Sequence, residues 1–177
     1  MSDGWESEYE LISKLGEGHF GVVYKARKDG DYYAVKEVNN INDRALQEIE
    51  ILEDVEHDNI VEYFEHFIKD GELAIVMEYA NKGTMFDFRM NLSSQKEKKF
   101  TKEDAVWEVL TQLASPLDYL HENRIMHRDL KPDNILCFFS IGYKSSSFQA
   151  LRFWNFKACG GRLSTRVLHR HINLLCT

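Results

Sequence analysis

Residues 127–136 read HRDLKPDNIL and bring carboxylates, cations and an amide together within ten positions. Side chains of these types can accept the proton of a hydroxyl group, hold a phosphate and bind a metal ion. The next four residues, CFFS, continue none of that pattern. Such a loop acts on a substrate only if other elements hold the substrate against it, so the rest of the chain must supply a site for phosphate.

The segment GEGHFGVV, residues 16–23, fits the spacing G-x-G-x-x-G-x-V and is the candidate for that site. A P-loop would need Gly-Lys-Ser/Thr leading into a helix, and a dinucleotide-binding fold also needs a helix after its glycines. Gly21 is followed instead by Val22 and Val23, which favour a strand. The remaining interpretation is a flap that lays backbone N–H groups over the phosphates of a nucleotide.

Strand and helix signals surround this flap. Segments rich in β-forming residues, separated by turn residues, predict five strands at 9–14, 22–26, 32–36, 60–68 and 73–79. Asn42 can cap a helix that runs to about Val55. After a polar loop at 93–99, apolar residues at helical spacing predict a long helix over 101–121. The expected fold class is therefore α+β, with a five-stranded antiparallel sheet and one helix followed by a helical part.

These motifs resemble the protein kinases. HRDLKPDN fits H-R-D-L-x-x-x-N, and Ala34-Val35-Lys36 matches the lysine strand that follows the glycine loop in that family. Lys-Pro after Asp-Leu is the serine/threonine-kinase style, and the segments EYFEHF and MEYANKGT are most similar to the NIMA-related kinases. The resemblance implies an N-lobe over 1–79 with the glycine loop, the lysine strand and one helix. It also implies a partial helical C-lobe over 80–137 with the hinge, a long helix and the catalytic loop.

The resemblance implies a role for each charged residue. Asp129 would accept the proton of the substrate hydroxyl, and Lys131 would steady the γ-phosphate. Asn134 would bind a metal ion. Lys36 would hold the α- and β-phosphates, and Glu48 in the following helix would be its ion-pair partner. The implied cofactors are ATP and Mg²⁺.

The resemblance also implies an adenine pocket. Met77 would be the gatekeeper, and the backbones of Glu78 and Ala80 would face the adenine edge. Val23 and Ala34 would lie above the ring, although ordinary core packing explains the apolar members equally well. The full set of expected nucleotide-binding residues is Gly16, Gly18, Gly21, Val23, Ala34, Lys36, Met77, Glu78, Ala80, Thr84 and Leu136.

Beyond Leu136 the resemblance fails. A kinase would continue with a strand pair, an Asp-Phe-Gly motif whose aspartate binds a second magnesium ion, Ala-Pro-Glu and a helical lobe. The nearest candidate is LRFWNFKA, with Asn155 in the aspartate position and Lys157 in the glycine position. Asparagine is neutral where magnesium prefers a carboxylate. The chain is thus expected to be a kinase that is truncated or divergent after the catalytic loop. Residues 138–177 would be a basic tail, either disordered or a degenerate activation region.

The distribution of charge and the spacing of the cysteines restrict the class of protein and its expected location. The net charge is −7, but 16 of the 22 basic and all 29 acidic residues precede Phe138, which leaves that part at −13 and the tail with six basic residues. The basic residues of the tail are scattered among apolar ones, so nucleic-acid binding is not expected. Three widely spaced cysteines fit neither a disulfide framework nor a zinc site, and no run is long and apolar enough for a membrane span. The expected location is intracellular, in the cytoplasm or the nucleus.

Two functions follow from these motifs. The first is a serine/threonine protein kinase that transfers the γ-phosphate of Mg-ATP to a protein substrate. The alternative is a catalytically impaired, nucleotide-binding pseudokinase or scaffold fragment, because a second metal-binding carboxylate is not evident in the sequence. The sequence makes no prediction about the protein substrate or the oligomeric state.

Overall fold

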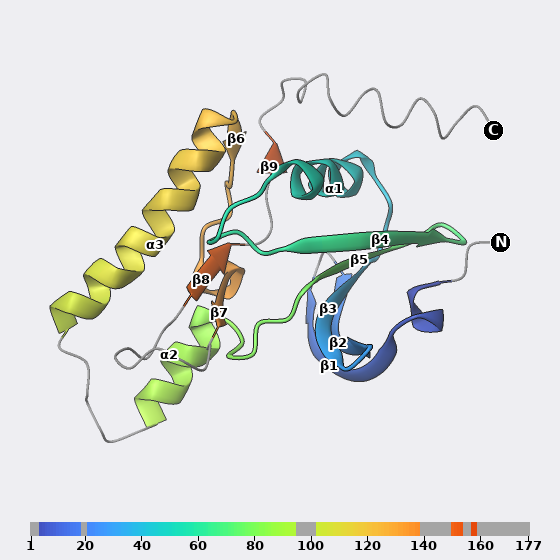
Figure 1. Cartoon of the computed structure of the whole chain (residues 1–177), viewed down its shortest axis with the longest axis horizontal. Helices are drawn as coiled ribbons and strands as arrows, with labels where there is room; N and C mark the ends of the chain where they lie inside the picture. The colour runs from blue at the N-terminus through green and yellow to red at the C-terminus, as the bar shows by residue number, and fades with distance from the viewer. Residues whose placement is uncertain (1–3, 19–20, 95–101, 139–149, 154–156, 159–177) are drawn as a thin grey trace.

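The computed structural model of the chain describes residues 4–18, 21–94, 102–138, 150–153 and 157–158. One part is a five-stranded sheet with a helix on it, and the other contains two further helices and two short strand pairs (Figure 1). This arrangement confirms the predicted kinase-like α+β fold with an incomplete helical lobe.

The five-stranded sheet is antiparallel throughout, in the order β1-β2-β3-β5-β4. Its strands are β1 (Glu10–Gly18), β2 (Gly21–Lys28), β3 (Asp31–Val38), β4 (Tyr63–Lys69) and β5 (Glu72–Glu78). Two Asp-Gly turns, at 29–30 and 70–71, close the β2–β3 and β4–β5 hairpins. Both residues of each turn have positive φ, with values of 52° and 96° in the first and 52° and 82° in the second. Asp-Gly favours this two-residue hairpin turn, so the local sequence sets the strand register.

Helix α1 (Asp43–Asp54) follows β3 and lies where the sequence predicted a helix from Asn42 to about Val55. The backbone N–H of Ala45 donates to Asn42 Oδ1 at 3.1 Å, so Asn42 is the predicted N-cap. Ala45, Ile49 and Leu52 are buried and belong to the main core of the molecule. The same helix carries Glu48, which is thereby held above the lysine strand.

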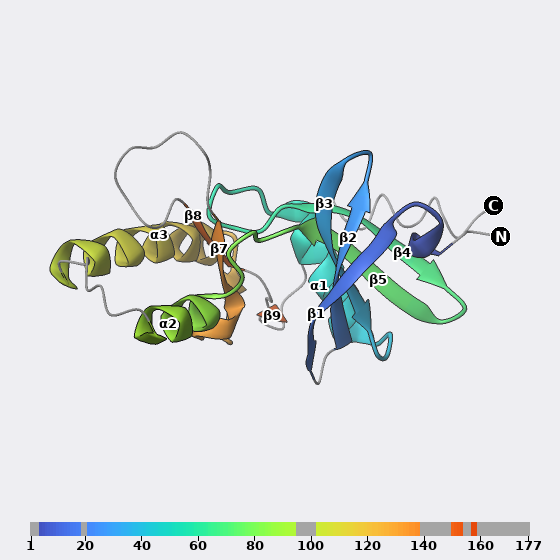
Figure 2. The ribbon, with the colours of Figure 1, turned by 90° about the horizontal axis from the view of Figure 1, so that it is seen from below.

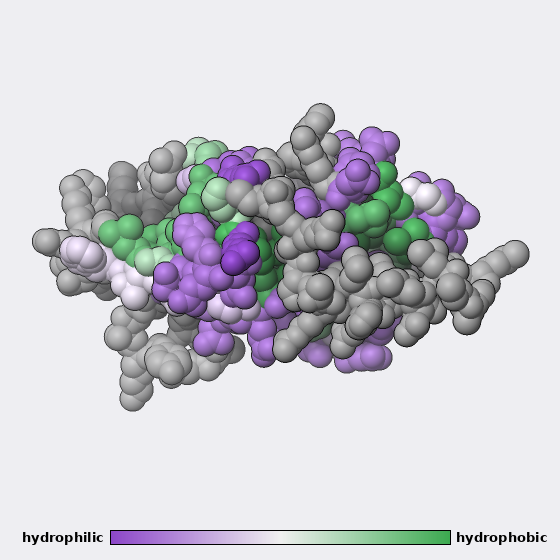
Figure 3. Space-filling model, turned by 90° about the horizontal axis from the view of Figure 1, so that it is seen from above, coloured by the Kyte–Doolittle hydropathy of each residue, from purple (hydrophilic) through white to green (hydrophobic). Residues whose placement is uncertain are grey.

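The helical part contains α2 (Met85–Ser94), α3 (Lys102–Glu122) and the short 3₁₀ turn η2 (Pro132–Asn134). Helix α3 continues through Pro116, which is fully buried, and it packs in the core with Leu120. Trp107 and Leu110, on the same helix, are 63% and 49% exposed. Figure 3 shows hydrophobic side chains at the surface of this part, toward the left of the view. The chain therefore leaves part of its long helix without a packing partner among the described residues.

Two strand pairs connect the helical part to the sheet. Strand β7 (Ile135–Phe138) pairs with β8 (Ala150–Phe153), and β6 (Ile125–Met126) pairs with β9 (Lys157–Ala158), both antiparallel. Strands β7 and β8 lie between the five-stranded sheet and helices α2 and α3 in both ribbon views (Figures 1 and 2). Within segment 138–177, β8 and β9 are thus ordered strands, and Leu151 and Phe153 are fully buried in the main core.

The N-terminal residues cover the outer face of the five-stranded sheet. A 3₁₀ turn, η1 (Trp5–Ser7), precedes β1, and Trp5 and Tyr9 are buried in a second core with Ala26, Val35, Ala74 and Val76. The indole N–H of Trp5 donates to Glu37 Oε1 at 2.9 Å. The sequence signals did not assign a role to this turn. None of the helices in the described ranges is long and apolar enough to cross a membrane.

Candidate functional site

A cavity of about 270 Å³ lies where the sheet meets the segment that follows β5. Its walls include eight of the residues expected to bind a nucleotide, which are Gly16, Val23, Ala34, Met77, Glu78, Ala80, Thr84 and Leu136. Six further lining residues had not been expected, and they are Leu15, Val61, Tyr79, Gly83, Asp87 and Asp133. The structure therefore brings together residues far apart in the sequence, from Leu15 to Leu136, around one pocket.

Backbone pairing explains why these residues converge. On β3, Ala34 lies opposite Met77 of β5, which places the proposed roof and gatekeeper side by side. The linker after β5 is bound to β7, because Lys82 N donates to Cys137 O at 3.1 Å and Cys137 N donates to Gly83 O at 2.9 Å. These bonds hold the linker beside Leu136 on the floor of the pocket.

The linker backbone is only partly available to a ligand. Glu78 N donates to Glu62 O at 2.9 Å, so Glu78 can offer a ligand its carbonyl but not its N–H. Ala80 O accepts a bond from Gly83 N at 3.2 Å. Of the linker backbone groups expected to face adenine, the Glu78 carbonyl and the Ala80 N–H are therefore the candidates for hydrogen bonds to a ligand.

Thr84 has a structural role that the sequence analysis missed. Its hydroxyl donates to Asp87 Oδ2 at 2.7 Å and accepts from Asp87 N at 3.1 Å, while Thr84 N donates to the same carboxylate at 3.0 Å. This reciprocal pattern is a capping box at the start of α2. Thr84 and Asp87 both line the pocket. The Asp87 carboxylate is therefore a second hydrogen-bond acceptor for a bound ligand, next to Thr84.

Lys36 and Glu48 form the ion pair that the sequence predicted. Lys36 Nζ lies 2.6 Å from Glu48 Oε1, and the two side chains are only 4% and 12% exposed. Lys36 and Ala34 are two residues apart on β3, so they point to the same face of the sheet. Lys36 itself is not among the residues that line the pocket. The ammonium is held away from water on the face of the sheet to which Ala34 also points, where its interaction with an anion is strong.

The catalytic-loop residues also come together. Asn134 Nδ2 donates to the backbone oxygen of Asp129 at 2.7 Å and to its Oδ2 at 3.0 Å, and Lys131 Nζ lies 3.4 Å from the same Oδ2. Asn134 is buried, whereas Lys131 and Asp129 are partly exposed. A carboxylate, a cation and an amide therefore share one loop, directly before the floor of the pocket at Leu136.

His127 packs between this loop and β8. It is buried, its Nδ1 accepts from Asp129 N at 3.4 Å, and its ring packs edge-on against Phe153 with centroids 5.1 Å apart. Arg128, between the two, has a φ of 56°, which is uncommon for a residue with a side chain. Such backbone persists only where the surroundings hold it, and Phe153 of β8 supplies part of that support.

The three glycines of the flap have different surroundings. Gly21 has a φ of 141°, and a Cβ there would lie 1.8 Å from Glu37 O, so only glycine fits. A Cβ at Gly16 or Gly18 would meet nothing within 4 Å. Gly16 lines the pocket, whereas Gly18 and Gly21 are not among its lining residues. The tip between them, residues 19–20, lies outside the described part of the chain.

Burial changes the acidity of two groups near the pocket. Burial raises the pKa of the Glu78 carboxyl group, and the nearby positive charge of Arg152 opposes that shift. Burial also raises the pKa of the Cys137 thiol to about 11, with a smaller contribution from the Asp87 carboxylate. Cys137 is therefore an unreactive thiol, as expected for a reduced buried cysteine.

Few of the described side chains could coordinate a magnesium ion near this loop. The amide oxygen of Asn134 is an acceptable ligand, and the Asp129 carboxylate is next to it. The described residues contain no cluster of three or more His, Cys, Asp or Glu side chains that could hold a metal ion. Asn155, the candidate for the second metal position, lies outside the described residues. The side chain of Lys157 is also not described, although its backbone belongs to β9.

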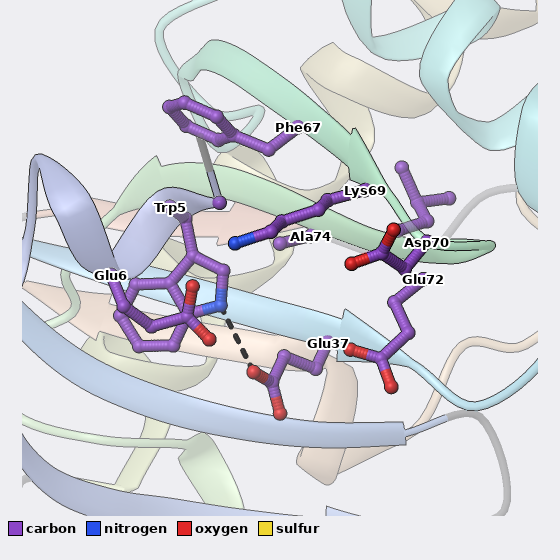
Figure 4. Close-up of a pocket in the computed structure, with 10 residues that line it drawn as sticks. Trp5, Glu6, Glu37, Phe67, Lys69, Asp70, Glu72 and Ala74 are labelled. Carbon is purple, nitrogen blue, oxygen red and sulfur yellow. Dashed lines mark hydrogen bonds between the residues drawn. The ribbon is translucent and has the colours of Figure 1, made fainter. Parts of the chain in front are cut away.

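A second cavity, of about 200 Å³, lies under the N-terminal turn on the outer face of the sheet. Figure 4 shows the acidic side chains of Glu6, Glu37, Asp70 and Glu72 around it, with Lys69 reaching across toward Trp5. Glu37 follows Lys36 on β3 and therefore points to the opposite face. This cavity is thus separate from the pocket that Ala34 and Leu136 line.

Comparison with known proteins agrees with this geometry. The sequence model of the protein kinase domain matches residues 9–145. The chain belongs to the protein kinase domain family. The match extends beyond Leu136, where the sequence resemblance had been expected to end.

Serine/threonine kinases are among the relatives of this kinase domain. It is 36% identical over 136 residues to the mouse serine/threonine-protein kinase Nek1, covering 72% of the chain and 11% of that protein. It is 39% identical over 137 residues to serine/threonine-protein kinase TIO of Arabidopsis thaliana, covering 73% and 10%. For the probable serine/threonine-protein kinase zyg-1 of Caenorhabditis briggsae, identity is 33% over 132 residues, covering 73% and 18%. The chain thus spans a fifth or less of the length of these relatives, and Nek1 among them confirms the predicted NIMA-like resemblance.

Proposed function

We propose that this kinase domain binds ATP in the 270 Å³ pocket and transfers the γ-phosphate to a serine or threonine hydroxyl of a protein substrate. The observation that supports this most directly is the buried Lys36–Glu48 pair, two residues along β3 from Ala34 in the pocket roof. An ammonium in that position is suited to the α- and β-phosphates of a nucleotide whose base lies under Ala34.

The catalytic-loop residues supply the chemistry of transfer. The substrate hydroxyl gives its proton to the Asp129 carboxylate while its oxygen bonds to the γ-phosphorus, and the bond from that phosphorus to the β–γ bridging oxygen breaks to release ADP. Lys131, 3.4 Å from the Asp129 carboxylate, stabilises the negative charge of the transferred group. Asn134 would hold Mg²⁺, which neutralises phosphate charge when bound. Asn134 also orients the Asp129 side chain through its 3.0 Å bond.

A second candidate function is ATP binding without transfer. It is supported by Asn155, the middle residue of the three that connect β8 to β9, because an amide replaces the carboxylate expected for the second metal ion. Both candidates use the same pocket and the same lysine. They differ in whether phosphate leaves the nucleotide for a protein hydroxyl.

Titration with a fluorescent ATP analogue and transfer of labelled γ-phosphate to a mixed Ser/Thr peptide array test the proposal. Lys36→Met should weaken nucleotide binding at least about tenfold, because a desolvated charge-assisted contact is lost. Lys14→Met removes an exposed ion pair with Glu17 and should leave binding unchanged. Asn155→Asp should raise the rate of transfer. Unchanged affinity in Lys36→Met would reject ATP binding here. Binding without transfer by the unaltered chain would favour the second candidate, and transfer that appears only in Asn155→Asp would assign the loss to this amide.

A further inference from the structure

An ion pair connects the end of β5 to β8, the strand that pairs with β7 after the catalytic loop. Arg152, on β8, donates from Nη1 to Oε2 of Glu78, the last residue of β5. The two residues are 74 positions apart in the sequence, and their side chains are only 24% and 23% exposed. Arg152 also lies over the ring of Phe138, 5.0 Å from its centroid. A partly buried pair with this packing is held more firmly than the exposed ion pairs of the sheet.

The position of Arg152 relates it to the nucleotide pocket. Arg152 lies directly opposite Leu136 in the β7–β8 pair, and directly opposed residues project from the same face. Leu136 forms the floor of the pocket. The guanidinium therefore extends from beside the floor to Glu78, the last residue before the linker.

Glu78 is held at two points. Its N–H donates to Glu62 O at 2.9 Å, and its carboxylate receives the Arg152 guanidinium. Burial disfavours the charged carboxylate, and Arg152 stabilises it in that form. The N–H bond fixes the peptide unit before the Glu78 Cα, and the Arg152 contact holds the side chain on that Cα. Because the linker after it is held to β7 through Lys82 N and Gly83 O, rotation about the Glu78 Cα–C bond, which sets the direction of the carbonyl, is restrained from both sides.

We propose that Arg152 is a positioning residue for nucleotide recognition, which aims the Glu78 carbonyl at the exocyclic amino group of adenine by holding the Glu78 carboxylate. The inference rests on the proposed function, since it requires adenine in the pocket. It assigns Arg152 an indirect role, because no contact between its guanidinium and the nucleotide is invoked. It also makes a residue from segment 138–177 part of the nucleotide site.

The test compares ATP with purine riboside 5′-triphosphate, which lacks the 6-amino group, by isothermal titration. Arg152→Met should weaken ATP binding by about three- to tenfold, the value of one net hydrogen bond, and change the affinity for the purine analogue by less than twofold. Arg152→Lys, which keeps the charge, should recover most of the preference for ATP. Arg27→Met, which removes the exposed Arg27–Glu10 ion pair between β1 and β2 of the five-stranded sheet, should change neither affinity.

A purely structural role would weaken both nucleotides equally in Arg152→Met, and that result would overturn the inference. An unchanged ratio of the two affinities would overturn it as well. If Arg152→Met does not fold, Glu78→Gln removes the charge on the partner while keeping the backbone, and the same loss of preference is expected. Absence of ATP binding in the unaltered chain would refute the proposed function itself, which separates the two failures.

Discussion

Phe153→Ala tests whether the strand after the catalytic loop belongs to the core. Phe153 is fully buried, and its ring packs on His127, which supports the catalytic loop. The backbone bonds of Phe153, from its N–H to Asn59 O at 2.9 Å and from Val61 N to its carbonyl at 3.0 Å, are retained in alanine. The substitution therefore removes only side-chain packing.

The expected cost is about 3–5 kcal/mol, because a buried phenylalanine loses its transfer energy and leaves a cavity. Domains of this size are stable by roughly 5–15 kcal/mol, so the variant would lose a large share of its stability. Urea unfolding followed by circular dichroism measures the change. Leu130→Ala, at a residue that is 50% exposed, is the control and should cost less than about 1 kcal/mol. A loss below about 1 kcal/mol in Phe153→Ala would refute the packing of β8 described above.

Two further predictions concern the flap and the buried thiol. Gly21→Ala should destabilise the N-lobe by more than about 2 kcal/mol, because its Cβ would lie 1.8 Å from a backbone oxygen. Gly16→Ala, where a Cβ meets nothing within 4 Å, should cost less than about 1 kcal/mol. Thermal melting of the two variants compares these costs, and equal effects would contradict the flap geometry. The pKa of Cys137 is raised from 9.0 to about 11 in the folded chain, so the folded state retains a proton that the unfolded state loses. The stability that Cys137 contributes should therefore be present below pH 9 and lost between about pH 9 and 11. The difference in unfolding free energy between the unaltered chain and Cys137→Ala, measured against pH, should show this decline, and a flat difference would contradict it.

Local signals in the sequence predicted most of the sheet and the site. Asp29-Gly30 and Asp70-Gly71 specify their hairpins by backbone conformation alone, and Asn42 specifies the start of α1 by one hydrogen bond. The catalytic loop is contiguous, so its motif already contained Asp129 and Asn134 at the spacing that lets them bond. Features within a few residues of one another could be inferred because the physics that forms them is local.

Features that depend on distant partners were not predictable in the same way. The segment ALRF is short and has no strand signal of its own, and its pairing with residues 135–138 makes it β8. The Glu78–Arg152 pair joins residues 74 positions apart, and no spacing rule connects them. The pocket residue Val61 likewise looks like an ordinary core residue until the fold brings it beside Met77.

The turn that precedes β1 has a practical consequence for anyone who expresses this domain. The family match begins at residue 9, four positions after Trp5, so a clone cut at that boundary would omit the indole. Trp5 is only 5% exposed, and without it Ala26, Val35 and Ala74 would face solvent on the back of the sheet. Such a shortened product would expose an apolar surface and self-associate, while the 270 Å³ pocket on the other face of the sheet remained intact. Boundaries taken from similarity alone would therefore give poor yields of a protein in which the pocket and the HRDLKPDN loop were both present.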